Sequence, residues 1–175
     1  MAILIIPDFK VFFAIVNKNA SYDGALEARE AYELLVNLKV ENKVEIILAK
    51  PIEDKIRKHI SDKQAPHFYT MVEKDYSTSG VAGYDADNCI AETAKNNSFR
   101  GHVIILALDP IQKEEVIKGS RKIITVNPAK FITGHKVAMT HSQALGSKTD
   151  LGDVLKFLFF IRPEIIDQAH NSRKK

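Results

Sequence analysis

The sequence predicts a three-layer α/β/α fold with a central, mainly parallel sheet. Residues 103–108 form a run of six apolar side chains without polar alternation, which is typical of a strand covered on both faces. A similar run lies at 44–49, and such runs alternate with segments of helical periodicity, which indicates parallel strands joined by helices. The 175 residues fit one domain, and a chain of this length buries roughly 70% of its unfolded surface, so it needs no metal or disulfide to fold.

The individual elements follow from apolar runs and from residues that start helices. Asp is favoured at a helix N-cap and Pro in the first turn, so Asp23, Pro51, Asp85 and Asp150 mark helix starts. The helix after Pro51 has a core face of isoleucines at i, i+4 and i+8 spacing. The predicted strands are 2–6, 44–49, 103–108 and 123–126. The predicted helices are 11–16, 23–38, 51–60, 85–94, 111–117, 150–161 and a short one from 163, and a helical turn is predicted at 128–132.

Other segments carry weaker signals. The polar residues 61–84 are predicted to form a long loop with one helical turn, and loops of this length are often functional. Residues 137–139 suit an edge strand. We expect residues 1–132 to form the α/β domain and 133–175 to form an extension packed on it, with a basic tail at 171–175.

Composition narrows the class of protein. The net charge of +3 neither requires nor excludes a nucleic-acid partner. Cys89 is the single cysteine, so no intrachain disulfide forms, and a reducing, cytoplasmic location fits. We expect no membrane partner, because no apolar run approaches the ~18 residues that span a bilayer. The histidines lack zinc-site spacing, and the glycines lack phosphate-binding spacing, so zinc and nucleotide sites are disfavoured.

Three carboxylates stand at comparable places in the predicted topology. Asp8 follows the first strand, Asp87 opens a helix, and Asp109 ends the strand at 103–108. Ligand sites of open α/β sheets lie beyond the carboxyl ends of the strands, so these acids are expected to converge. Clustered carboxylates without His or Cys suit Mg²⁺ or Mn²⁺, which activates water and stabilises charge on a phosphate. Each acid also has a simpler interpretation, because Asp caps helices and begins turns.

The order of these features resembles PIN-domain ribonucleases, the toxin components of many toxin–antitoxin pairs. The resemblance consists of the strand ending at Asp8, the strand-Pro-helix unit at 44–60, the Asp-led helix at 87–94, the strand ending at Asp109, and a strand followed by Pro-x-x-Phe at 123–132. It implies a metal-dependent endoribonuclease that uses Mg²⁺ or Mn²⁺ to cleave RNA. Asp8, Asp87 and Asp109 would be the catalytic, metal-binding acids, with Asp85, Asp54 and Glu53 as further candidate ligands.

The sequence also departs from that family's pattern. Phe9 and Lys10 follow the first Asp, where the family usually has hydroxyl or amide residues. Lys55 stands where a Glu is expected, and Ala107 replaces a Thr or Ser two residues before the last Asp. Glu53 and Asp54 are also ordinary first-turn acids of a helix. These departures motivate an alternative, which is a catalytically weakened or inactive PIN-like scaffold that binds RNA or a protein.

A third hypothesis is a doubly wound regulatory or small-molecule-binding domain, because acids at strand ends occur there too. The partners expected from the resemblance are RNA and an antitoxin-like protein. The apolar stripe within 151–160 exceeds what one core face requires, so part of it could form a homodimer contact.

Overall fold

A parallel five-stranded sheet forms the centre of the molecule. The computed structural model describes residues 2–17, 19–59, 70–77, 85–146 and 149–173. Within them the strand order is β3-β2-β1-β4-β5, and every paired strand is parallel. The strands are β1 (Ile3–Pro7), β2 (Val44–Ala49), β3 (Glu73–Asp75), β4 (Val103–Leu106) and β5 (Ile123–Val126).

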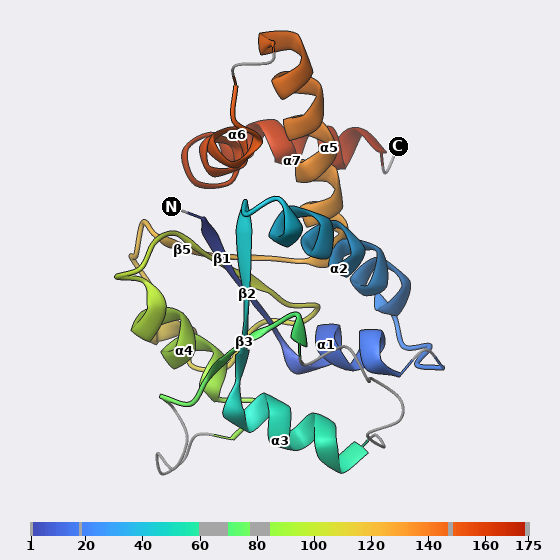
Figure 1. Cartoon of the computed structure of the whole chain (residues 1–175), viewed down its shortest axis with the longest axis vertical. Coiled ribbons are helices and arrows are strands. Elements are labelled where there is room, and N and C mark those ends of the chain that lie inside the picture. Colours follow the sequence, from blue (N-terminus) through green and yellow to red (C-terminus); the bar gives the residue numbers. More distant parts are fainter. Residues whose placement is uncertain (1, 18, 60–69, 78–84, 147–148, 174–175) are drawn as a thin grey trace.

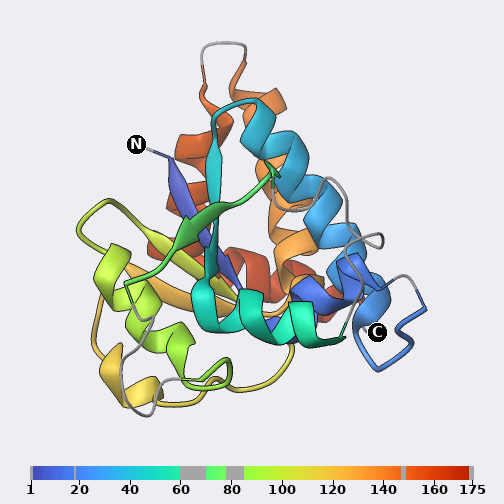
Figure 2. The ribbon, with the colours of Figure 1, turned by 60° about the horizontal axis from the view of Figure 1, so that its bottom comes forward.

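Helices cover both faces of the sheet and confirm the predicted three-layer α/β/α fold. Figure 1 shows α4 on one side of the strands and α2 on the other, while α1 and α3 lie side by side across one end in Figure 2. The helices are α1 (Phe9–Val16), α2 (Ala25–Val40), α3 (Lys50–His59), α4 (Cys89–Asn97), α5 (Pro128–Leu145), α6 (Leu151–Lys156) and α7 (Pro163–Arg173), with a 3₁₀ turn η3 (Glu114–Val116) and a π-helical turn η4 (Phe157–Ile161).

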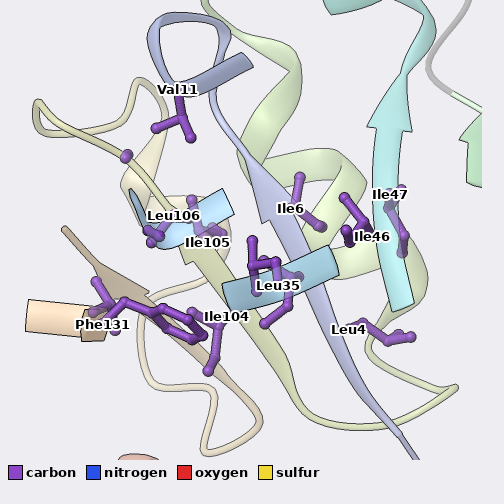
Figure 3. Packing of buried hydrophobic residues seen from close by; sticks show 14 of the residues in the cluster. Leu4, Ile6, Val11, Leu35, Ile46, Ile47, Ile104, Ile105, Leu106 and Phe131 are labelled. Carbon is purple, nitrogen blue, oxygen red and sulfur yellow. The ribbon is translucent and has the colours of Figure 1, made fainter. Parts of the chain in front are cut away.

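The core consists of branched aliphatic side chains on both faces of β1, β2 and β4. Successive strand residues point to opposite faces, and all residues of β1 and β4 are buried, so both faces are covered. Figure 3 shows Leu35 of α2 and Phe131 of α5 packing over these strands. The unbroken apolar runs of the sequence therefore correspond to strands between two helical layers.

The strand order has one switch point, between β1 and β4. From β1 the chain builds outward to β2 and β3, and it then returns to add β4 and β5 on the other side. In the register of β1 and β4, Pro7 stands beside Leu106, so the residues that follow both strands meet at one edge. Open α/β sheets bind ligands at this point. The order also differs from the 2-1-3-4-5 order of receiver-like domains.

Helix α5 is longer than predicted. Asn127 caps it, with the Lys130 N–H donating to its side-chain oxygen at 2.7 Å, and Pro128 occupies the first turn. The helix then continues through the expected domain boundary at 132 and through residues 137–139, so the edge-strand prediction there was wrong. Gly134 leaves space for Phe159, because a Cβ at Gly134 would lie 2.3 Å from that ring.

Three further predictions need correction. The helix expected at 111–117 is only the turn η3, because Lys113 has a φ of 54°, which is incompatible with helix. Strand β3 lies within the predicted loop 61–84, whose parts 61–69 and 78–84 are outside the described residues. Helix α2 is capped by Gly24 rather than Asp23; its φ of 87° suits glycine.

No helix of the described residues has the length and apolar character to cross a membrane.

Candidate functional site

A cleft of about 240 Å³ lies at the switch point, beyond the carboxyl ends of β1 and β4. The three acids singled out in the sequence all line it, together with two lysines. Ile90, which is buried, and Phe9 supply apolar parts of its wall. The described lining residues are Asp8, Phe9, Lys10, Lys55, Asp87, Ile90, Asp109, Pro110, Ile111 and Gln112.

Asp8 joins the end of β1 to the start of α1. Its N–H donates to Leu106 of β4 at 2.9 Å, and its carboxylate accepts from the Phe9 N–H at 2.7 Å, which caps the helix. Burial raises the pKa of Asp8 most strongly, the Phe9 hydrogen bond lowers it, and the charges of Asp87 and Asp109 raise it further. Asp8 thus caps helix α1 and also interacts electrostatically with the other two acids of the cleft.

Lys10 and Asp109 form the first ion pair of the cleft. The Lys10 Nζ lies 2.6 Å from the Asp109 Oδ2, although the two residues are 99 positions apart in the chain. The hydrogen bond with Asp109 raises the pKa of Lys10. Both side chains are about half exposed, so the pair is open to solvent and to ligands.

Lys55 and Asp87 form the second pair. The Lys55 Nζ lies 3.1 Å from the Asp87 Oδ1 and 4.3 Å from the centre of the Phe9 ring. A cation above an aromatic face is attracted by the ring's quadrupole, so Phe9 and Asp87 together hold the ammonium in place. The three departures at Phe9, Lys10 and Lys55 therefore belong to one arrangement.

Asp85 has a structural role beside this cleft. Its Oδ1 accepts from the Asp87 N–H at 3.0 Å, from the Asn88 N–H at 3.1 Å and from the Asn88 amide at 2.9 Å. These bonds form the turn that leads into α4. Asp85 is not among the described residues that line the cleft. It therefore positions Asp87, which does line the cleft.

Glu53 and Asp54 also lie apart from the cleft lining. Glu53 is 3% exposed and forms ion pairs with Lys50 and Arg57 of its own helix and with Lys74 of β3. Asp54 pairs with Lys50 at 2.8 Å. Glu53 thus lies toward β3 with three cations around it, whereas Asp54 is a half-exposed acid paired with one lysine.

Cys89 opens α4 behind the cleft and is fully buried. Burial raises the pKa of its thiol to about 12, and the charge of Asp8 adds to the shift. A thiol with that pKa stays protonated at neutral pH, and the thiolate is the reactive form of cysteine. Cys89 therefore contributes packing, as its place on the apolar face of the helix predicts.

The charge balance decides whether a divalent cation fits the cleft. Three carboxylates supply the oxygen ligands that Mg²⁺ and Mn²⁺ prefer, yet Lys10 and Lys55 hold two of them. Among the described residues, no three His, Cys, Asp or Glu side chains are grouped so that they could hold one metal ion. In this arrangement the ammonium groups of Lys10 and Lys55 provide positive charge beside two of the three acids.

A second cleft, of about 710 Å³, adjoins the first, and Lys10 and Asp109 line both. It lies between the ends of β4 and β5, the start of α2 and helix α7. These segments lie far apart in the sequence and share no motif. The cleft could therefore be identified only from the folded structure. Its described lining residues are Lys10, Tyr22, Asp23, Gly24, Glu27, Leu108, Asp109, Asn127, Pro128, Ala129 and His170.

Comparison with protein-family models, with curated proteins and with solved structures gives no match for this chain.

Proposed function

We propose that this protein binds single-stranded RNA through a PIN-like cleft in which two lysines take the place of the divalent cation. The observation that carries the proposal is the pairing of Lys10 with Asp109 and of Lys55 with Asp87. The resemblance to PIN-domain ribonucleases supplies RNA as the ligand class. The lysines neutralise Asp109 and Asp87 without a metal, so binding is metal-independent and the RNA is not cleaved.

The surroundings of the cleft support a single-stranded ligand. Phe9 lines the cleft and stacks on Phe13 at 5.3 Å, and His59 lies 5.9 Å from the Phe9 ring. The last turn of α3 adds the exposed Lys58. Aromatic side chains that stack with bases, combined with cations that contact phosphates, are the means by which proteins hold single strands.

The test measures the anisotropy of a fluorescein-labelled oligoribonucleotide over a series of salt concentrations. We expect salt-dependent binding that is equal in EDTA and in Mn²⁺. Lys55→Met should weaken it several-fold and reduce the salt slope by about 0.7, because one phosphate contact is lost. Lys136→Gln, on the exposed face of α5 outside both clefts, removes the same charge and should match wild type.

Two results would overturn the proposal. One is an affinity that does not depend on salt or that Lys55→Met leaves at the wild-type value, because then the cleft lysines contact no phosphate. The other is binding that requires Mn²⁺, because then the lysines do not substitute for a cation.

A metal-dependent endoribonuclease is the second candidate. The convergence of Asp8, Asp87 and Asp109 on one cleft favours it, as does the raised pKa of Asp8, which burial and then the charges of the other two acids produce. Incubation of RNA with Mn²⁺ and wild type, Asp87→Asn or Asp109→Asn tests this candidate. Cleavage by wild type but by neither variant would replace the first proposal with this one. Equal cleavage by wild type and both variants, or no cleavage by any of them, would exclude Asp87 and Asp109 as catalytic residues.

A further inference from the structure

The second cleft differs from the first because two of its acids have no cationic partner among the described residues. Asp23 and Glu27 line it, and neither takes part in an ion pair within the described residues. Glu27 lies in the first turn of α2 and is half-buried, whereas Asp23 is exposed. Hydrogen bonds to Glu27 therefore compete less with water. Because a carboxylate only accepts hydrogen bonds, this wall of the cleft selects ligands that present donors.

The two clefts are joined at the Lys10–Asp109 pair. Lys10 is 52% exposed there, so its ammonium is available to a phosphate as well as to Asp109. Asn127 also lines the second cleft, and Leu108 supplies an apolar part of its wall. A strand that crosses the first cleft can thus place its next nucleotide in the second, with Lys10 near the connecting phosphate.

We infer that the second cleft binds a guanine base of the RNA strand and that Glu27 is its specificity-determining residue. Single-stranded RNA is commonly recognised through splayed-out bases that are hydrogen-bonded on their Watson–Crick edges. On that edge guanine presents two adjacent donors, N1–H and N2–H, which match the two oxygens of one carboxylate. Adenine, cytosine and uracil each place an acceptor beside their donor, which would meet the carboxylate with like partial charge.

This inference rests on the proposed function, since it concerns the same RNA strand. The experiment compares uridine oligomers that carry one central guanosine, inosine, adenosine or cytidine with an all-uridine oligomer, in competition against the labelled strand. We expect wild type to prefer the guanosine oligomer by about tenfold, the range of a good bidentate contact. Inosine lacks the N2 amino group and should lose most of that preference.

Variants then assign the preference to one side chain. Glu27→Gln should reduce the affinity for the guanosine oligomer about tenfold, to the level of the adenosine oligomer, because the amide faces the base with a donor. Glu30→Gln removes the same charge one turn further along α2, on an exposed side chain outside the second cleft, and should keep the preference.

The outcomes separate the two proposals. Salt-dependent binding of all oligomers with equal affinity would overturn the guanine inference alone. A guanosine preference that persists in Glu27→Gln would overturn the role of Glu27. Failure of every oligomer to bind would overturn the proposed function, and with it this inference.

Discussion

Glu53 and Asp8 are both withdrawn from solvent near the same end of the sheet, yet their surroundings are opposite. Glu53 is 3% exposed and has three cations within 3.7 Å, from Lys50, Arg57 and Lys74. Burial raises the pKa of Asp8, and the charges of Asp87 and Asp109 raise it further, although the charge of Lys55 lowers it. Glu53 therefore lies in positively charged surroundings, whereas Asp8 lies close to other negative charges.

This difference shows that burial alone does not mark a functional carboxylate. A buried acid with an excess of cations ties α3 to β3 and is a structural element. When the folded structure disfavours the ionised form of an acid, that acid lowers the stability of the protein at neutral pH. Groups with such perturbed pKa values cluster at functional sites. The sequence offers both as acids next to strand ends, so only their partners separate them.

The largest expected effect is on Glu53. Glu53→Gln should lower the free energy of unfolding by about 2 kcal/mol, because three cations lose their buried partner while remaining partly hydrated themselves. Urea unfolding followed by circular dichroism measures this change. The matched control is Asp54→Asn on the same helix, which breaks an exposed pair with Lys50 and should cost less than about 0.5 kcal/mol. Equal losses in the two variants would remove the contrast between Glu53 and an ordinary surface acid.

The next effect concerns Asp8. Asn caps helices about as well as Asp, so Asp8→Asn should keep the cap and be at least as stable as wild type at neutral pH. Asp8→Ala loses the cap and should fall about 1 kcal/mol below Asp8→Asn. Both variants are compared by urea unfolding under identical conditions.

The pH dependence of that difference follows from the raised pKa. A carboxyl group whose folded pKa lies above its ordinary value of 3.8 contributes stability below that value and loses it as pH rises through the folded pKa. The advantage of Asp8→Asn over wild type should therefore grow from about pH 4 to about pH 8. An advantage that shrinks over this range would contradict the raised pKa.

The smallest effect on stability is expected for Lys55. Lys55→Met keeps an apolar contact with the Phe9 ring but leaves Asp87 without its cation, and exposed pairs are worth less than about 1 kcal/mol. The sharper readout is the Asp8 carboxyl resonance, followed by ¹³C NMR over a pH titration. Because the charge of Lys55 lowers the pKa of Asp8, that pKa should rise in the variant. An unchanged Asp8 pKa would mean that the two groups do not interact.

The sequence by itself determined the layers and the places of the acids. Long apolar runs predicted β1, β2, β4 and β5, because a strand buried on both faces needs no polar alternation. Asp150 and Pro163 marked the starts of α6 and α7, since these residue types suit helix N-termini. The position of Asp8 and Asp109 at one sheet edge followed from parallel topology.

The tertiary structure alone decided the partners of those acids. Strand β3 has the sequence Glu-Lys-Asp, which lacks a strand pattern, and it exists through its pairing with β2. Lys10 forms an ion pair with Asp109, which lies 99 residues further along the chain. Glu27 of α2 lines the second cleft together with this pair. Local patterns determine which side of an element is apolar, but whether a carboxylate faces a cation, another acid or an open cleft depends on contacts between segments far apart in the chain. The acids of this protein therefore acquire their different roles only in the folded state.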